Sequence, residues 1–291
     1  MNCIGITLGD SAGIGSEVVQ KALDSGKLNP NFQYRVIGEQ VGEPGMPTRE
    51  TALAAFSALE ESARLALSGK ICAVVTGPIS KVHMQEVGFD FPGQTEFFAS
   101  RCGVSDFAMC LTGGPLTVAL VTIHLPLAEV APSLKKPEIV RVGKLLAHFL
   151  KARGSARVAV AGLNPHAGES GKMGREEIDL IAPAIEELNR SFAAAGEGVR
   201  FEGPISPDTV FNRAVAGEFD GVLCMYHDQG LIPLKLLAFD QGVNVTLGLP
   251  IIRTSPDHGT AFAIAGKNIA RPESMIEAIN LAAELASRPR R

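Results

Sequence analysis

The sequence predicts an α/β fold built on a mostly parallel sheet. Two observations lead to this prediction: short apolar runs of strand length alternate with amphipathic helical patterns, and the alternation continues along the whole chain. The first strand, residues 3–8, leads through a glycine-rich turn into a helical pattern that carries Val18 and Ala22. Strands joined through helices run parallel, with right-handed crossovers. No linker interrupts the pattern, so we expect any division into two domains to be made by a cleft.

The other elements follow from the same periodicities. Strands are expected at residues 33–38, 71–76, 108–112, 116–122, 157–162, 221–226 and 243–249. Helices are expected at residues 50–67, 137–150, 176–188 and 272–286. Gly113 and Gly114 separate two of these strands and predict a hairpin there.

The composition excludes several classes of protein. With 46% hydrophobic and 20% charged residues among 291, the chain is too apolar for disorder, and its net charge of −4 argues against nucleic acid as a main partner. The five cysteines include no Cys-x-x-Cys pair, which indicates buried thiols in a reducing compartment. No apolar run approaches ~20 residues, and no leader pattern precedes the first strand. We therefore expect a cytoplasmic protein that does not enter a membrane.

Residues 9–15, Gly-Asp-Ser-Ala-Gly-Ile-Gly, join the first strand to the first helix. Unpaired N–H groups at the start of a helix can bind an anion such as a phosphate. The spacing differs from the Gly-x-Gly-x-x-Gly fingerprint of dinucleotide-binding folds, so a tight turn is the other interpretation. The residues by themselves leave both interpretations open.

The stretch 224–261 concentrates reactive side chains between apolar runs and is the first candidate for an active site. His227 follows one apolar run, and His124 and His166 stand in the same position after two others. If the three runs are parallel neighbouring strands, their imidazoles lie at one edge of the sheet, where open α/β sheets bind ligands. Three histidines with an open coordination position suit Zn²⁺, Co²⁺ or Mn²⁺, and unrelated loop histidines are the alternative.

Two cations lie in the same stretch. Lys235 stands among leucines, where its amine either serves a site or merely extends to solvent. Arg253 follows an apolar run and suits bidentate binding of a carboxylate or phosphate, with a structural ion pair as the alternative. A metal site beside two cations indicates a small anionic substrate, phosphorylated by preference. His258, next to Asp257, is interpreted as structural.

Separate motifs, in order along nearly the whole chain, resemble one known family. They are Gly-Asp-x-Ala-Gly-Ile-Gly at 9–15, Thr-Gly-Pro at 76–78 with Lys81, Phe-Pro-Gly at 91–93, Thr-Glu-Phe-Phe at 95–98, Thr-Ile-His-Leu-Pro-Leu at 122–127, Gly-Leu-Asn-Pro-His-Ala-Gly-Glu at 162–169 and Pro-Asp-Thr at 207–209. The stretch 224–261 is the densest part of the match. The sequence is identified as a member of the 4-hydroxythreonine-4-phosphate dehydrogenases of vitamin B6 synthesis.

The resemblance implies a fold and an assembly. The fold is similar to that of isocitrate and isopropylmalate dehydrogenases and is not a Rossmann domain. It has two α/β domains and an interdomain cleft, the first at residues 1–97 with 245–291 and the second at 98–244. The family works as a homodimer with each site built across the interface. Its cofactor is NAD, with NADP as the alternative.

The resemblance also implies the site residues. A divalent metal would be held by His124, His166 and His227, with Zn²⁺ favoured and Co²⁺, Mn²⁺ or Mg²⁺ as alternatives. Substrate contacts fall on Thr95, Lys235, Asn244 and Arg253.

Three features depart from the family's pattern. The family's Gly-His-Thr, whose histidine touches the substrate, is here Gly93-Gln94-Thr95, and glutamine can neither carry charge nor transfer a proton. Serines at 11 and 16 replace prolines usual in the first loop, and the chain is shorter around residues 39–50. Gln94 is still expected to bind substrate, and it puts the identity of the substrate in question more than the reaction.

The expected reaction is NAD-dependent oxidation of a secondary alcohol on a phosphorylated hydroxy acid, with decarboxylation of the product. The metal would activate the hydroxyl, and Asp208 or Asp228 would accept its proton. 4-Hydroxythreonine 4-phosphate is the leading substrate, and threonate or erythronate phosphates are alternatives. A cyclic diol of aromatic catabolism fits poorly, because Thr95, Asn244 and Arg253 are retained. Two alternative functions belong to other classes of protein. They are a metal-dependent hydrolase and a non-catalytic phosphometabolite sensor that has lost its enzymatic activity.

Overall fold

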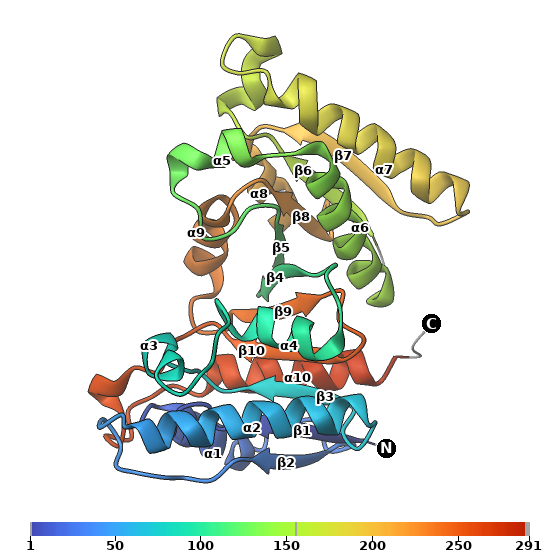
Figure 1. Ribbon diagram of the computed structural model, residues 1–291. Helices are drawn as coiled ribbons and strands as arrows, with labels where there is room; N and C mark the ends of the chain where they lie inside the picture. Colours follow the sequence, from blue (N-terminus) through green and yellow to red (C-terminus); the bar gives the residue numbers. More distant parts are fainter. Residues whose placement is uncertain (1, 155, 289–291) are drawn as a thin grey trace. The chain divides into compact units, whose positions relative to one another are not determined.

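The structure, a computed structural model, describes residues 2–154 and 156–288 (Figure 1). The chain divides into two compact units: unit 1 comprises Met1–Ser105 and Asp240–Arg291, and unit 2 comprises Asp106–Phe239. Each unit has its own set of paired strands and its own hydrophobic core.

The unit boundaries lie at Ser105 and Asp240, in the regions where the approximate boundaries at 97 and 244 are expected. The boundary expected after residue 97 falls inside helix α4 (Gln94–Cys102), and the one expected after residue 244 falls inside strand β9 (Val243–Leu247). The structure keeps both elements whole and divides the chain in the adjoining connections. Hydrogen bonds within an element make it a poor place for a boundary.

Unit 1 has its strands in the order β2-β1-β3-β10-β9. Their bounds are β1 (Cys3–Thr7), β2 (Gln33–Ile37), β3 (Ala73–Thr76), β9 (Val243–Leu247) and β10 (Ile252–Pro256). β1 pairs in parallel with β2 and β3, and β3 pairs in parallel with β10, whereas β9 and β10 are antiparallel. The predicted mostly parallel sheet is confirmed here. The central strand β3 is buried throughout, as is usual for a strand covered on both faces.

Helices cover both faces of the unit 1 sheet (Figure 1). They are α1 (Gly15–Asp24), α2 (Arg49–Leu67), α3 (Lys81–Gln85), α4 and α10 (Glu273–Ala286), with a 3₁₀ turn η3 (Phe262–Ile264). The chain runs outward from β1 to β2 and then back to β3, so right-handed crossovers put α1 and α2 on opposite faces. α10 packs beside α1, and α4 packs beside α2.

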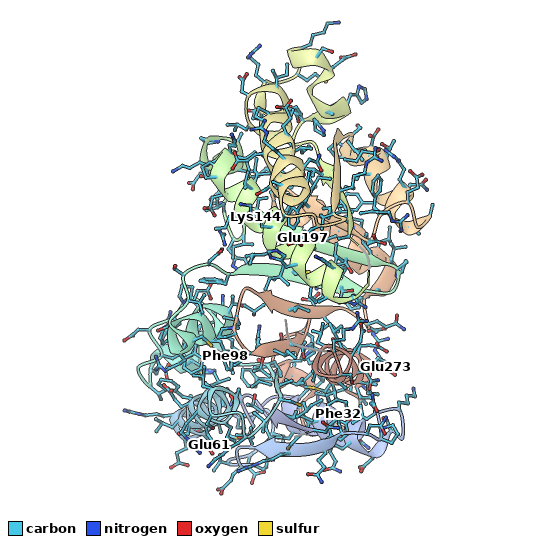
Figure 2. The ribbon with its side chains drawn as sticks, turned by 90° about the vertical axis from the view of Figure 1, so that its right-hand side faces the viewer. Phe32, Glu61, Phe98, Lys144, Glu197 and Glu273 are labelled. Carbon is cyan, nitrogen blue, oxygen red and sulfur yellow. The ribbon has the colours of Figure 1, made fainter. Side chains whose placement is uncertain are left out.

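The core between α2 and α4 is aromatic. Phe97 makes edge contacts with Phe56, Phe91 and Phe98 and stacks on Phe89, at centroid separations between 5.1 and 6.2 Å. Such pairs add to the free energy of burying the rings. Phe98, labelled in Figure 2, is fully buried, and its ring also contacts the guanidinium of Arg253 on β10.

The glycine-rich segment 9–15 is a closed turn. Backbone N–H groups of Asp10, Gly13 and Ile14 donate to the carbonyl oxygens of Pro78, Asp10 and Thr260, and Ala12 N–H donates to the Asp10 carboxylate. A Cβ on Gly15 would lie 1.9 Å from the carbonyl oxygen of Leu8. These N–H groups are therefore already used by the protein, which favours the tight-turn interpretation over an anion site.

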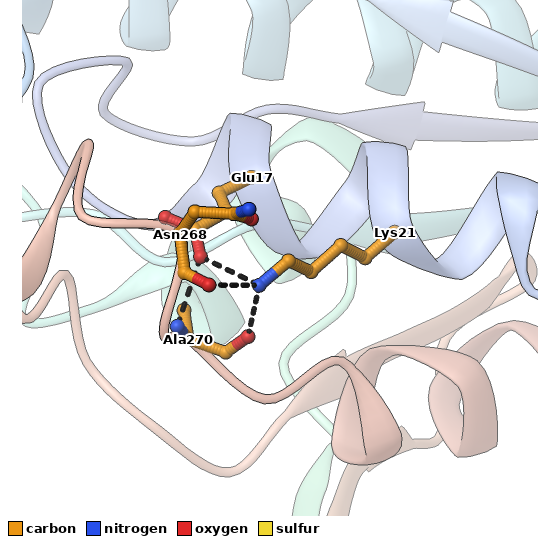
Figure 3. A network of polar contacts seen from close by, with 4 residues as sticks. All are labelled: Glu17, Lys21, Asn268 and Ala270. Atoms are coloured by element: carbon orange, nitrogen blue, oxygen red, sulfur yellow. Dashed lines mark hydrogen bonds and ion pairs between the residues drawn. The ribbon is translucent and has the colours of Figure 1, made fainter.

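A polar network joins α1 to the segment before α10 (Figure 3). The Lys21 amine donates to Oε1 of Glu17 at 2.9 Å and to the carbonyl oxygens of Asn268 and Ala270 at 3.0 and 2.9 Å. Ala270 N–H donates to the same Glu17 oxygen. The network holds residues 249 positions apart in the chain and is structural.

Unit 2 has its strands in the order β4-β5-β8-β6-β7. Their bounds are β4 (Ala108–Gly113), β5 (Leu116–Leu120), β6 (Arg157–Ala161), β7 (Arg200–Ile205) and β8 (Gly221–Cys224). β4 and β5 form the predicted antiparallel hairpin, and β5, β8, β6 and β7 are mutually parallel in that order. β8, expected at residues 221–226, ends at Cys224, so His227 begins a helix instead of ending a strand.

The helices of unit 2 also lie on two faces. They are α5 (Leu127–Ser133), α6 (Lys136–Ala152), α7 (Ala182–Ala194), α8 (Pro207–Val215) and α9 (His227–Ala238), with a tight turn η1 (Pro165–Gly171) and a π-helical turn η2 (Glu177–Ile181). α6 and α7 pack together, whereas α8 and α9 cover β5 and β8 from the opposite face. The helix expected at residues 176–188 is thus divided, because a π-helical turn precedes α7. Within the described residues, no helix is long and apolar enough to cross a membrane.

Candidate active site

Three histidine-bearing segments leave the same edge of the unit 2 sheet. β5, β8 and β6 are parallel neighbours with β8 in the centre, as the sequence argument required. His124 follows β5, His227 follows β8 and His166 follows β6. All three segments therefore begin at the carboxyl ends of adjacent strands, the usual location of ligand sites in α/β sheets.

Hydrogen bonds hold these three segments to one another. The Thr122 hydroxyl donates to the carbonyl oxygen of Met225 at 2.8 Å, which joins the segment after β5 to the one after β8. The buried Gln229 amide accepts from Met225 N–H and donates to the carbonyl oxygen of Gly162, both at 2.6 Å. Gln229 thereby joins the segment after β8 to the one after β6. Sequence reasoning did not single out Gln229, because its partners lie outside its own helix.

His124 and His227 are neighbours. Their ring centroids are 5.5 Å apart, and Nδ1 of His227 lies 2.7 Å from Oδ1 of Asp228. Beside them is a pocket of about 300 Å³. Its lining is Thr122, Ile123, His124, Leu125, Leu127, Val130, Tyr226, His227, Asp228 and Ile232. Burial is the main cause that raises the pKa of the Tyr226 hydroxyl, and the nearby Asp228 carboxylate adds to the shift. Asp228 is thus placed to orient an imidazole at the mouth of a pocket.

His166 stands in an unusual backbone segment. The residues from His166 to Ser170 all have positive φ, between 44° and 75°, so the turn η1 is left-handed. For residues other than glycine this conformation costs about 1–2 kcal/mol each. Such strain persists only where the surroundings enforce it, and it often marks functional sites.

Glu177 holds the segment that leads into this left-handed turn. Its buried carboxylate accepts hydrogen bonds from the N–H groups of Leu163 and Asn164 at 2.8 and 2.7 Å and from Nδ2 of Asn164 at 3.0 Å. Glu177 lies in the π-helical turn η2, a feature that is frequent at functional sites. The sequence pattern gave no sign of this role, because position 177 reads as the polar face of an amphipathic helix.

The residues present fit a divalent metal in part. Two neighbouring imidazoles, one oriented by a carboxylate, are suitable donors for Zn²⁺ or a similar ion. His166 leaves the same sheet edge, yet the described residues contain no group of three or more His, Cys, Asp or Glu side chains able to hold a metal. The three-histidine site stays a prediction.

Unit 1 contains a second group of the predicted residues, centred on Arg253. This side chain, on β10, is 3% exposed. Its guanidinium donates from Nη2 to the hydroxyl of Thr76 at 2.7 Å and to Oε1 of Gln94 at 3.1 Å, and from Nη1 to the hydroxyl of Thr246 at 3.2 Å. Its Cζ lies 5.9 Å from the ring centroid of Phe98. Successive side chains of a strand point to opposite faces of the sheet. The next residue, Thr254, donates from its hydroxyl to a carbonyl oxygen of α10, so Arg253 points to the other face, toward α4.

The charge of Arg253 is not neutralised by an ion pair. In the described part of the chain no carboxylate forms a salt bridge with it, and its Nε has no hydrogen-bond partner there. Burial lowers the pKa of Arg253 to about 10. A buried cation held by neutral acceptors alone is costly. The structural ion pair that sequence left open is therefore absent among the described residues, and an arriving anion would relieve the cost.

Two more predicted substrate contacts lie in the same unit. The Thr95 hydroxyl, in the first turn of α4, is 3.4 Å from that of Thr246. Asn244, opposite Ser255 in the β9–β10 pair, has a buried Oδ1 without a partner among the described residues. Thr246 thus links Thr95 to Arg253, and Arg253 contacts Gln94 directly.

The remaining predicted residues, Lys235 and Asp208, lie in unit 2. Lys235 is in α9, with its amine 5.7 Å from the ring centroid of Phe239. Asp208 is exposed in the first turn of α8, where Oδ1 accepts from the Ser206 hydroxyl at 2.6 Å. The roles of Lys235 and Asp208 stay predictions.

Fold and site together define a class: a metabolic enzyme of two α/β units, with candidate metal ligands at a sheet edge and a buried arginine ready for an anion. The family model described as pyridoxal phosphate biosynthetic protein PdxA matches residues 12–282. A 4-hydroxythreonine-4-phosphate dehydrogenase of Zymomonas mobilis is 40% identical over 328 residues, covering 98% of this chain and 96% of the relative. The chain belongs to this family of oxidoreductases.

Solved structures agree with this assignment. A 4-hydroxythreonine-4-phosphate dehydrogenase from Klebsiella pneumoniae superposes with a TM-score of 0.84 at 36% identity, covering 98% of this chain and 100% of that one. A β-decarboxylating dehydrogenase from Thermococcus kodakarensis, at 20% identity and a TM-score of 0.52, shares the fold over 97% of this chain and 82% of its own. The predicted similarity to the isocitrate and isopropylmalate dehydrogenase fold is confirmed.

Proposed function

We propose that this chain catalyses the NAD-dependent oxidation of 4-hydroxythreonine 4-phosphate, with decarboxylation, in pyridoxal phosphate biosynthesis. The observation that carries the proposal is Arg253, a buried guanidinium that only neutral groups hold in the described structure. A phosphate or carboxylate of the substrate would complete its interactions. Membership of a family of 4-hydroxythreonine-4-phosphate dehydrogenases supplies the reaction.

Several polar side chains would orient the substrate. Arg253 and Thr95 would bind an anionic group, and Lys235 would add a second cation. The unpartnered Oδ1 of Asn244 would accept from a hydroxyl or amine. Binding the substrate at several points places its reactive carbon in one orientation, which lowers the entropic part of the barrier.

His124, His166 and His227 would hold a divalent metal, Zn²⁺ by preference and Co²⁺, Mn²⁺ or Mg²⁺ otherwise. Such a metal, when bound, lowers the pKa of a hydroxyl and polarises a carbonyl. Asp228 would hold the proton of His227 on Nδ1 and so leave Nε2 as the electron-pair donor. Glu177 would keep the turn that bears His166 in its left-handed form.

The general base would be Asp208 or Asp228. Asp228 is already engaged with His227, which suits an orienting role. Asp208 is exposed in the first turn of α8 and is the alternative base. NAD, or NADP in its place, would accept the hydride.

The proposal includes a homodimer in the cytoplasm. Unit 2 exposes large apolar side chains on α5 and α9, among them Leu127 at 73%, Ile232 at 66% and Leu236 at 85%. Burial of such a surface in a dimer would be favourable. None of the five cysteines, all of which lie in the described ranges, forms a disulfide, in keeping with the proposed reducing compartment.

The proposal is tested by NADH formation. Metal-depleted protein is mixed with NAD and 4-hydroxythreonine 4-phosphate, then supplied with Zn²⁺, Co²⁺, Mn²⁺ or Mg²⁺. We expect NADH formation only with metal, and loss of at least about 100-fold in kcat/KM for His124→Ala and His227→Ala. Equal activity in chelator and in metal would contradict the metal role, and absence of NADH under every condition would contradict the reaction.

A second substrate is supported by Gln94. Because glutamine stands where the family has histidine, threonate and erythronate phosphates belong in the same assay. A larger kcat/KM for either of them than for 4-hydroxythreonine 4-phosphate would assign the same chemistry to that substrate.

A further inference from the structure

The amide of Gln94 is bound on both sides. Nε2 donates to the carbonyl oxygen of Gly77 at 3.0 Å, and Oε1 accepts from Nη2 of Arg253 at 3.1 Å. A guanidinium offers only donors and a carbonyl offers only an acceptor, so these two partners fix the orientation of the amide. Gln94 thus connects the end of β3 to the charged group on β10.

Gln94 differs from the other acceptors of Arg253. Thr76 and Thr246 lie on strands of the sheet. Gln94 instead lies in the first turn of α4, the helix on the face of the sheet to which Arg253 points. Nη2 is shared between Thr76 and Gln94. Without Gln94, Nη2 would keep a single acceptor, and the plane of the guanidinium would be less constrained.

We propose that Gln94 is a positioning residue, whose neutral amide fixes the Arg253 guanidinium for anion binding without neutralising its charge. The inference rests on the proposed function, in which Arg253 binds an anionic group of the substrate. It assigns Gln94 a role through Arg253 in place of a direct part in the chemistry. The amide itself does not titrate in the physiological range, so pH does not change the charge at position 94.

Other side chains at position 94 would act differently on the Arg253 guanidinium. A neutral imidazole can donate to Gly77 and accept from Arg253, as the amide does, but an imidazolium has only donors and would repel the guanidinium. A carboxylate would form an ion pair with Arg253 and compete with the substrate anion. Charged groups in this region are Arg253, Glu96 on the same helix, and Lys81, whose Nζ lies 4.0 Å from the position of a Cβ on the adjoining residue Gly93.

The test compares kcat and KM of wild type, Gln94→His, Gln94→Glu and Gln94→Leu across pH, with exposed Gln20→Leu as the matched control. We expect Gln94→His to match wild type within about 3-fold at pH ~8.5 and to show a KM at least about 10-fold higher at pH ~5.5. Gln94→Glu should raise KM by about 30-fold or more throughout this range, and Gln94→Leu by about 10-fold. In each case kcat should change by less than about 3-fold.

Ratios to wild type at each pH cancel the titration of the substrate phosphate. A pH profile of Gln94→His parallel to that of wild type, an unchanged KM for Gln94→Glu, or a loss confined to kcat would each overturn the proposal. The first two outcomes would show that charge at position 94 does not reach Arg253, and the third would show a direct part in the chemistry.

A second measurement separates this proposal from the proposed function. Rotation of the Arg253 guanidinium is followed by ¹⁵N NMR, with Arg253→Lys used to assign its signals. Slow rotation in wild type and fast rotation in Gln94→Leu supports positioning, even if no substrate yields NADH. Equal rotation in both proteins overturns positioning, even if NADH is formed.

Discussion

Arg253 shows how one residue combines burial with charge. Its three neutral acceptors bind Nη1 and Nη2, and no carboxylate in the described residues forms a salt bridge with it, although the charge of Glu96 acts on it without direct contact. The site is therefore prepared for an anion before the anion arrives, which reduces the reorganisation needed on binding.

Replacing Arg253 by lysine keeps the charge and removes the planar fork. We expect Arg253→Lys to raise KM for the phosphorylated substrate by about 10- to 100-fold, because an ammonium cannot make the paired contacts of a guanidinium. Steady-state kinetics measure the effect. Arg271→Lys is the control, since Arg271 is exposed and pairs with Asp240. An equal KM for the two variants would exclude a substrate contact at Arg253.

Glu177 acts at the same scale on the other candidate group. In Glu177→Gln, Oε1 can still accept from the N–H groups of Leu163 and Asn164, but the new amide would face Nδ2 of Asn164, donor against donor. We expect the free energy of unfolding in urea to fall by about 1–3 kcal/mol. Exposed Glu186→Gln should change it by less than about 0.5 kcal/mol. A loss no larger than that of the control would mean that the carboxylate does not brace the turn.

At the scale of elements, the order of β5, β8 and β6 determines that the three histidine-bearing segments start at one edge of the sheet. The connections after these strands determine where each histidine side chain lies. The left-handed turn η1 then redirects the chain after β6.

Gly168 lies where the left-handed turn η1 meets the π-helical turn η2. A Cβ on Gly168, where φ is +75°, would lie 2.6 Å from Oε2 of Glu177. We expect Gly168→Ala to lower the free energy of unfolding by about 2–4 kcal/mol, from backbone strain together with displacement of the carboxylate. Gly196→Ala is the matched control, with φ of +66° and nothing within 4 Å of its Cβ, and should cost about 1 kcal/mol. Equal losses would indicate that the contact with Glu177 is unimportant.

At the scale of the whole molecule, the pH dependence of stability reflects buried thiols. Burial raises the pKa of Cys110 to about 12 and also raises the pKa of Cys224 strongly. Between the pKa of an exposed thiol, about 8.5, and that of the folded state, the unfolded chain binds fewer protons than the folded one. The contribution of each thiol to stability is thus complete below pH ~8.5 and is lost as pH rises toward ~12.

We expect the free energy of unfolding to fall above pH ~9 by about 1.4 kcal/mol per pH unit for each of these two thiols. Denaturant titrations between pH ~8 and ~10.5 measure the slope. Cys110→Ala and Cys224→Ala should each make the slope shallower, whatever their effect at neutral pH. A slope that the double variant leaves unchanged would assign the loss to tyrosine and lysine titration instead.

Much of the fold and part of the site follow from local patterns. Alternating apolar runs and helical periodicity predict the elements, and the strand-end positions of His124 and His227 predict that the two rings meet. The patterns do not predict that His166 adopts a left-handed conformation, or that a carboxylate at position 177 holds the segment before it. They also do not predict the partners of Arg253, which lie 7, 159 and 177 positions away in the chain.

The sequence by itself determined the α/β class, the family and the set of candidate residues, because apolar periodicity and motif order are properties of the chain alone. The tertiary structure decided which of those residues act together. It closed the glycine-rich segment into a turn, left Arg253 without an ion pair among the described residues, and placed Gln94 between that guanidinium and Gly77. These outcomes depend on burial and on hydrogen bonds between distant segments, which exist only once the strands and helices have packed.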